Sequence, residues 1–308
     1  MIYFRGHINL QIRRRFFMKL FVTDLDGTLL NSDHKLSDYS LNAIRTAMNM
    51  GLNVCIATGR GYSDILEIIS ELEVKPYIIS SNGASVYHSN GKKLYSMSIP
   101  KDQVSEIIDY LKNQGLEFEV STDEFTYVTQ KGLDILHQEL EDLGEISTER
   151  REELTNDVLG LVLSQGNLKV IPTSKELLEI IDSANNISSI SAYLNKIKDA
   201  MEYFSMDKRI RTFTSWKYNF EMTSSKTSKG IALEHLCNHL GISLKDVAAI
   251  GDNYNDLSMI KIAGIKGGME NAVPNLLSIV DYVAPSNDND GAAKFLYKLM
   301  DDMGLLYK

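Results

Sequence analysis

The sequence predicts an α/β fold, with a doubly wound parallel sheet as its core and an α+β domain inserted into that core. Two observations lead to this prediction. Short apolar runs alternate with amphipathic stretches before about residue 80 and again after about residue 224, and such alternation is typical of parallel strands joined by right-handed helical crossovers. Between about residues 100 and 222, helical and strand patterns mix without this alternation, which indicates a separate α+β unit.

The first part of the core contains apolar runs that end at glycine turns, as buried strands do. Ser37 offers an N-cap for an amphipathic helix that ends before Gly51. Asn90 and Gly91 stand between two strand-like runs, which predicts a β-hairpin. The expected strands are 19–24, 52–57 and 76–80, and the expected helices are 37–50 and 63–72.

The inserted unit and the end of the chain follow the same kind of pattern. In the inserted unit we expect helices over 102–114, 174–183 and 193–204, and strands over 116–120, 125–129, 159–163, 211–215 and 218–222. In the last segment we expect helices that begin near residues 229, 255 and 290, and strands over 247–252 and 281–285. The predicted domains are therefore a core of residues 18–97 and 223–308 and a cap of residues 98–222. Residues 1–17 are basic and without a pattern, and we expect them to be a non-structural N-terminal extension.

Composition narrows the class of protein. The chain has 308 residues, 44% hydrophobic and 24% charged, which is ordinary for a globular protein. A net charge of -9 argues against a nucleic-acid surface, and no apolar run approaches the roughly 18 residues of a membrane helix. Cys55 and Cys237 do not make a disulfide framework, so we expect a cytoplasmic protein. We expect a monomer or a weak homo-oligomer.

In the stretch "KLFVTDLDGTLL", an apolar run that predicts a buried strand leads directly to Asp24 and Asp26. Buried carboxylates are costly unless something positive meets them, so either a partner inside the protein neutralises them or they hold a metal. Thr58 follows the second strand and Asp252 a later one. Because the carboxyl ends of parallel strands lie at one edge of a sheet, these groups should converge there, together with Lys229 at a helix start.

Each fragment also has a structural interpretation. "TGR" is a common strand-to-helix turn, "GDNYND" can cap a helix, and a single lysine is usually solvated. His235, Cys237 and His239 share a helical spacing without a further ligand cluster, so a partly exposed helix face explains them. Trp216 and Tyr218 could line a substrate pocket or pack the last hairpin of the inserted unit.

Four motifs, "DLDGTLL", "ATGR", "SKG" and "GDNYND", occur in the order and setting found in the haloacid dehalogenase-like phosphatases, and the chain resembles the Cof-type, subclass IIB members most. The stretches "SSNGA", "GGMENA" and "SNDNDGAA" are similar to accessory stretches of that subgroup. The resemblance runs from Met18 onward and is weakest over residues 100–210. It implies a Rossmann-like core with the cap inserted after the third core strand.

The resemblance also implies residue roles. Asp24 would be the nucleophile that forms an aspartyl-phosphate, and Asp26 the general acid and base. Mg²⁺ would be held by the side chains of Asp24 and Asp252 and by the backbone carbonyl of Asp26, because hard cations prefer oxygen ligands.

The remaining motif positions would bind the phosphate. The hydroxyl of Thr58, the backbone N–H groups of Leu25 and Gly59, the Lys229 ammonium and the Asn255 amide would contact its oxygens. Asp256 would orient Lys229 or the metal's waters. Asn271 and Asp290 match accessory positions, for which we expect a structural role.

The leading hypothesis is therefore a Mg²⁺-dependent phosphatase of small phosphorylated metabolites, such as sugar phosphates, flavin mononucleotide or pyridoxal phosphate. A phosphotransferase or mutase on the same site is an alternative, and would need an acceptor that outcompetes water. A non-catalytic regulatory protein that binds phosphometabolites is a second alternative, although such a protein has no physical reason to keep the full motif set.

Overall fold

The computed structural model describes residues 18–73, 75–142, 154–155, 158, 167–214 and 217–306. Within these residues the chain divides into two compact units. The first contains the described residues up to Arg60, then Ile65–Ser96 and the chain from Ser228 onward. The second contains Met97–Thr227 and the short segment Gly61–Asp64. The predicted extension over residues 1–17 lies outside the described residues.

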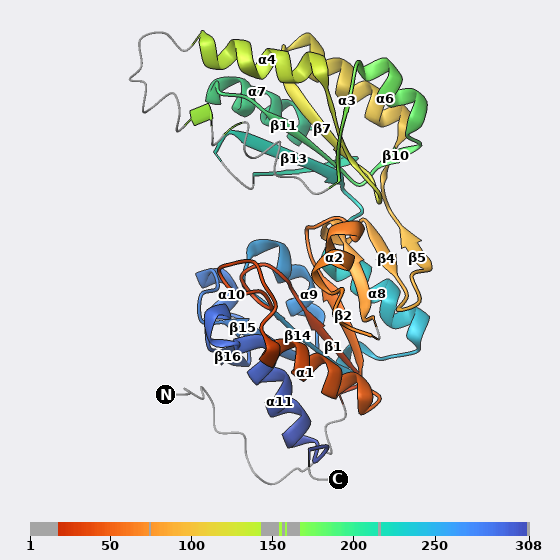
Figure 1. The fold of residues 1–308 in the computed structure, drawn as a ribbon, viewed down its shortest axis with the longest axis vertical. Helices are drawn as coiled ribbons and strands as arrows, with labels where there is room; N and C mark the ends of the chain where they lie inside the picture. Colours follow the sequence, from red (N-terminus) through yellow and green to blue (C-terminus); the bar gives the residue numbers. More distant parts are fainter. Residues whose placement is uncertain are drawn as a thin grey trace. The chain divides into compact units, whose positions relative to one another are not determined.

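The first unit is built on an eight-stranded sheet in the order β16-β15-β14-β1-β2-β3-β4-β5 (Figure 1). All neighbours from β16 to β3 are parallel, and β4 and β5 are added antiparallel. The strands are β1 (Leu20–Thr23), β2 (Asn53–Ala57), β3 (Tyr77–Ser80), β4 (Ser85–Tyr87), β5 (Lys93–Ser96), β14 (Val247–Gly251), β15 (Ile265–Met269) and β16 (Tyr282–Ala284).

Helices cover both faces of this sheet. Figure 1 shows α1 and α11 in front of it and α8 and α9 behind it. The helices are α1 (Asp38–Asn49), α2 (Tyr62–Ile68), α8 (Lys229–Leu240), α9 (Leu257–Ile262), α10 (Pro274–Leu277) and α11 (Gly291–Asp302). Phe21 of β1 meets Phe295 of α11 with ring centroids 6.2 Å apart. The predicted α/β class with a Rossmann-like parallel core is confirmed.

Local signals in the core sequence explain several element boundaries. Ser37 caps α1 by accepting a hydrogen bond from the Ser40 N–H, as predicted. The predicted hairpin is formed by β4 and β5, and Gly91 in its turn has a φ of 84° that favours glycine. Strand β15 was not predicted, because its sequence "IKGGM" places two glycines where apolar side chains would mark a strand.

The second unit has a six-stranded sheet in the order β12-β13-β11-β7-β8-β9, with β8 and β9 parallel and the other pairs antiparallel, and a separate pair of β6 and β10. The strands are β6 (Ile99–Pro100), β7 (Glu117–Ser121), β8 (Thr126–Thr129), β9 (Leu168–Ile171), β10 (Ser183–Ala184), β11 (Asn186–Ile190), β12 (Ile210–Phe213) and β13 (Asn219–Ser224). The helices are α3 (Lys101–Asn113), α4 (Gln130–Glu141), α6 (Ser174–Ile180) and α7 (Leu194–Ser205).

Alternation along β7 separates two kinds of side chain. Phe118 and Val120 enter an apolar core that also includes residues of α3, α6 and α7. Glu117 and Glu119 point to the opposite face and are nevertheless buried. The helix expected over 174–183 ends earlier, because Ile181 adopts an extended conformation before β10. The strand expected over 159–163 lies outside the described residues.

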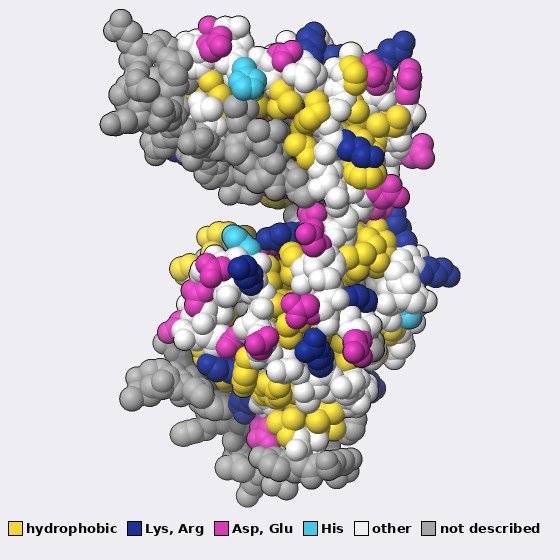
Figure 2. Space-filling view, in the orientation of Figure 1, with side chains coloured by type: hydrophobic (Ala, Val, Ile, Leu, Met, Phe, Trp, Pro, Cys, Tyr) yellow, Lys and Arg dark blue, Asp and Glu magenta, His cyan; other side chains and the backbone are white. Residues whose placement is uncertain are grey.

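Acidic and basic side chains are interspersed over the face drawn in Figure 2, rather than gathered by sign. Among the helices that the structure describes, none is both long and apolar enough to cross a bilayer.

Candidate active site

Asp24 lies directly after β1, the strand that pairs with both β14 and β2. Its backbone N–H continues the ladder by donating to the Ile250 carbonyl at 3.1 Å. Its side chain is buried, with the residue only 5% exposed. The central strand therefore delivers a carboxylate to the carboxyl edge of the sheet, as the sequence predicted.

Lys229 lies at the first position of α8, where the Ser228 side chain caps the helix. Its ammonium group is fully buried and donates hydrogen bonds of 2.6 Å to Oδ1 of Asp24 and to Oδ1 of Asp256. Burial acts to lower the pKa of Lys229, but the charges of these two carboxylates raise it above its ordinary value. Lys229 is therefore a permanently charged bridge between two buried acids.

Asp256 is held from both sides. One carboxylate oxygen accepts from Lys229, and the other accepts the backbone N–H groups of Asp252 at 2.9 Å and Asn253 at 3.0 Å. These contacts fix the turn between β14 and α9. The Asp252 side chain remains on the other side of this turn and accepts a 2.8 Å hydrogen bond from the Thr28 hydroxyl.

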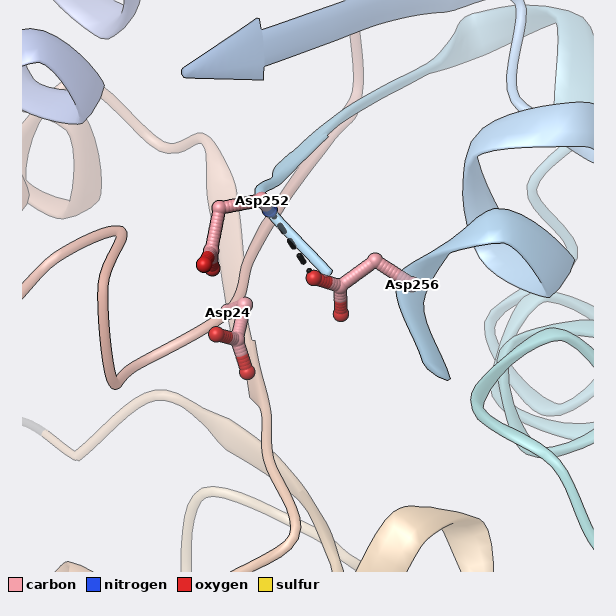
Figure 3. A group of neighbouring side chains, drawn as sticks. All are labelled: Asp24, Asp252 and Asp256. Atoms are coloured by element: carbon pink, nitrogen blue, oxygen red, sulfur yellow. Dashed lines mark hydrogen bonds between the residues drawn. The ribbon is translucent and has the colours of Figure 1, made fainter. Parts of the chain in front are cut away.

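Asp24, Asp252 and Asp256 bring their carboxylates together, with one oxygen from each within 4.8 Å of the others (Figure 3). With one ammonium among three carboxylates, the cluster has two negative charges in excess when all are ionised. Burial and the charge of Asp256 raise the pKa of Asp24, and burial raises the pKa of Asp252 to about 6. An all-oxygen donor set with this excess of negative charge is compatible with a divalent cation.

The Asp26 side chain takes no part in that cluster. Its two oxygens accept hydrogen bonds from Nε and Nη2 of Arg60 at 2.7 and 2.6 Å, and Nδ1 of His34 lies 3.2 Å from Oδ1. Burial acts to raise the pKa of Asp26, but the hydrogen bonds and charge of Arg60 outweigh it and the pKa is lowered. Asp26 and Asp24 are thus close in sequence but have different surroundings.

The second predicted strand end also reaches this edge of the sheet. Thr58 is buried after β2, and its hydroxyl oxygen accepts the Arg60 N–H at 3.2 Å. Gly59 lies close to the Asn82 amide, so that a Cβ added at Gly59 would come within 3.3 Å of it. Asn255 donates to Oδ1 of the same Asn82 at 3.0 Å. Asn82 therefore joins the turn after Thr58 to the turn that carries Asn255.

Two accessory stretches brace the loop that follows Asp24. Gly27 has a φ of 71°, and a Cβ there would lie 2.6 Å from Oδ2 of Asp252, so only glycine lets the loop pass this carboxylate. The Asn271 amide donates to the Gly27 carbonyl at 2.8 Å. Asp290 accepts from the hydroxyl of Ser37, the cap of α1. These contacts support the structural roles expected for Asn271 and Asp290.

The model of the haloacid dehalogenase-like hydrolases matches residues 21–296, and so spans all four motifs. The chain belongs to this family. It is an enzyme of the phosphatase type, as its motifs predicted, and the Cof-type resemblance is confirmed.

Curated relatives within the family cover most of the chain. It is 33% identical to the phosphatase YwpJ of Bacillus subtilis over 92% of this chain and 100% of that protein. It is 32% identical to YwtE of the same organism, named a 5-amino-6-(5-phospho-D-ribitylamino)uracil phosphatase, over 92% of this chain and 98% of that protein.

Solved structures agree with this assignment. A haloacid dehalogenase-like hydrolase from B. subtilis is 33% identical, with a TM-score of 0.74 over 92% of this chain and all of that one. The protein TM0651 of Thermotoga maritima, at 22% identity, also has a TM-score of 0.74 and covers 92% of this chain and 97% of its own. The latter shares the fold.

Several residues of this haloacid dehalogenase-like site were not predicted in their present contacts. The sequence predicts Arg60 only as part of the "TGR" turn and Asn82 only as part of an accessory stretch. The position of Arg60 directly after "TG" was the available signal. His34 belongs to no motif, so no role is predicted for it from the sequence. His235, for which the sequence predicts a place on a helix face and not metal binding, stacks on Tyr95 with ring centroids 3.8 Å apart. Trp216 lies outside the described residues.

Proposed function

We propose that this phosphatase hydrolyses small phosphorylated metabolites with the aid of Mg²⁺, through an aspartyl-phosphate formed on Asp24. The observation that carries the proposal is the convergence of Asp24, Lys229 and Asp252 at the end of the central strand. An intermediate of this kind divides one difficult displacement into two easier ones.

In the first step, a carboxylate oxygen of Asp24 attacks phosphorus and the ester oxygen leaves. Asp26 donates a proton to that oxygen, and afterwards takes a proton from the water that attacks the aspartyl-phosphate. Lys229 neutralises charge beside Asp24, a role supported by its 2.6 Å contact and by its full burial. Asp256 holds Lys229 in place, and this is supported by the three hydrogen bonds that its side chain accepts, one from Lys229 and two from backbone N–H groups of its own turn.

The residues present fit a Mg²⁺ ion. The Asp24 and Asp252 side chains and the Asp26 backbone carbonyl would hold it, all of them oxygen donors. When bound, Mg²⁺ supplies positive charge that offsets the phosphate and the crowded carboxylates. The excess negative charge of the cluster and the raised pKa of Asp252 support a cation at this place.

The phosphate oxygens would be received by Thr58, Lys229 and Asn255 and by the backbone N–H groups of Leu25 and Gly59. Phosphoryl transfer depends mostly on such positioning and on neutralisation of charge. The Thr58 hydroxyl supports this role. Its oxygen accepts the Arg60 N–H, and among the described residues its proton has no acceptor, so it can donate to a ligand.

The substrate class is a small phosphate monoester. The named substrate of the relative YwtE, a ribitylaminouracil phosphate, is of this kind and joins sugar phosphates, flavin mononucleotide and pyridoxal phosphate as candidates. We place the enzyme in the cytoplasm, a location supported by the free thiols of Cys55 and Cys237.

A screen of metabolite phosphates with Mg²⁺, repeated with a chelator, tests the proposal through release of inorganic phosphate. We expect Mg²⁺-dependent release from at least one small ester, and none from Asp24→Ala. Turnover that persists in Asp24→Ala would exclude the aspartyl-phosphate. A parallel assay with added glycerol separates hydrolysis from phosphotransfer, because a transferase would form glycerol phosphate in place of inorganic phosphate.

A further inference from the structure

The guanidinium of Arg60 binds the Asp26 carboxylate through two hydrogen bonds. Nε donates to Oδ2 at 2.7 Å and Nη2 donates to Oδ1 at 2.6 Å, so each carboxylate oxygen receives one donor. Paired contacts of this kind fix the plane of a carboxylate as well as its position, which a single ammonium cannot do. The Asp26 side chain is still 38% exposed, so it remains accessible to a ligand.

Arg60 is itself anchored to the proposed phosphate-binding turn. Its N–H donates to the Thr58 hydroxyl oxygen, and its carbonyl accepts the Ser81 N–H at 2.9 Å. The side chain that holds Asp26 therefore starts from the same short turn as Thr58. Movement of that turn would shift both groups together.

The loop after Asp26 adds a weaker third contact. His34 has a φ of 57°, a conformation that non-glycine residues rarely adopt, and its N–H donates to the Asn31 carbonyl at 2.9 Å. The Asn31 side chain closes the same loop by accepting the Lys35 N–H at 2.9 Å. This turn brings His34 within 3.2 Å of Asp26, although the His34 side chain is largely exposed.

We propose that Arg60 is a positioning residue for Asp26, the general acid and base. Arg60 acts on the reaction through Asp26 and not through direct contact with the phosphate. The inference rests on the proposed function, since it needs Asp26 to transfer protons. A carboxylate that is free to rotate reaches the leaving oxygen in only a fraction of its orientations, and loss of orientation is a known cause of slower catalysis. The Arg60 pair removes that freedom, and His34 reinforces it.

A double-mutant cycle in the full-length Mg²⁺-loaded enzyme tests this inference. Arg60→Ala is compared with the parent chain and, separately, within Asp26→Asn. Glycerol 2-phosphate has a poor leaving group and needs the acid, whereas p-nitrophenyl phosphate needs it little. We expect Arg60→Ala to lower kcat for glycerol 2-phosphate at least about tenfold. The pre-steady-state release of p-nitrophenol from p-nitrophenyl phosphate should slow less, because only this first step can proceed without the acid. Within Asp26→Asn the same change should alter kcat less than about twofold, because the residue it acts through is gone.

Three controls keep the result interpretable. Arg45→Ala removes an exposed arginine of the same unit that donates to the Glu71 carbonyl, and should leave both rates unchanged. Arg60→Lys keeps the charge but not the paired donors, so its kcat should lie between those of the parent chain and Arg60→Ala. If Arg60→Ala does not fold, Arg60→Lys takes its place in the cycle. Asp24→Ala should be inactive in every background, and activity there would overturn the proposed function itself.

Two outcomes would overturn the inference while leaving the proposed function intact. An equal loss in both backgrounds would mean that Arg60 acts on the substrate directly. An unchanged kcat for both esters in Arg60→Ala would mean that Asp26 needs no positioning by Arg60.

Discussion

Replacement of Glu119 by glutamine should stabilise this protein, and the gain should grow as the pH rises. Glu119 lies in the middle of β7, is 3% exposed, and has one carboxylate oxygen without a hydrogen bond in the described structure. Its cross-strand neighbour Ser188 lies between it and Glu221 of β13. Burial, with the charge of Glu221, raises the pKa of Glu119 from 4.5 to about 8.

The sign and the size follow from proton linkage. Because the folded state holds the proton more tightly than the unfolded state, folding stability is lost as the pH rises from 4.5 towards 8. Each pH unit in that interval costs about 1.4 kcal/mol, which gives a cost of about 3 kcal/mol at pH 7 and under about 1 kcal/mol at pH 5. Glutamine keeps the shape and carries no proton to lose, so Glu119→Gln should recover these amounts.

Urea unfolding at pH 5 and pH 7, followed by circular dichroism, measures both values. Glu124→Gln is the matched control, since Glu124 is exposed in the turn that follows β7. A gain of the same size at both pH values, or no gain at pH 7, would refute the assignment of a buried, proton-binding Glu119.

Further predictions concern the carboxylate cluster and the loop after β1. Asp26→Asn should slow turnover of ordinary esters by about 10²–10⁴-fold. Its Mg²⁺ affinity, measured by calorimetry, should be nearly unchanged because the backbone carbonyl survives, and a parallel loss of Mg²⁺ binding would contradict this division of roles. Lys229→Met should lower the unfolding free energy by about 3–5 kcal/mol without Mg²⁺, because Asp24 and Asp256 lose their only described counter-charge. Urea unfolding without Mg²⁺ measures this loss, and urea unfolding with Mg²⁺ measures its partial recovery. Mg²⁺ affinity should be about tenfold weaker at pH 5 than at pH 7, because the Asp252 carboxyl, with a pKa of about 6, binds a proton at the lower pH; an affinity independent of pH would count against Asp252 as a ligand.

The convergence of Asp24 with Asp252 could be predicted from sequence, because it depends on topology. Once the strands are known to be parallel, whatever follows them must gather at one edge of the sheet. The N-cap Ser37 could be predicted equally well, since its hydrogen bond is local in the chain. The partners of Asp26 could not, because they depend on the side-chain conformation of Arg60 and on the unusual backbone of His34.

Strand β15 shows a second limit of sequence patterns. Gly267 and Gly268 interrupt the apolar signal, yet the packing requires them. A Cβ at Gly267 would lie 2.7 Å from the Phe295 ring, and one at Gly268 would lie 2.9 Å from Leu276. The strand lost its pattern because helices approach it too closely for side chains, and that approach is a tertiary property.

The placement of β1 between β2 and β14 also orders events during synthesis. Lys229 and Asp24 are 205 residues apart, and Thr28 and Asp252 are 224 apart, so the contacts of the cluster are among the most distant in the chain. A ribosome has released the first strand long before it makes the β14 residues that complete its ladder. During that interval the growing chain exposes an open edge of the first strand, while the inserted unit has all of its own residues once Thr227 is made. Chains that terminate before residue 247 should therefore be favoured substrates for chaperones and proteases.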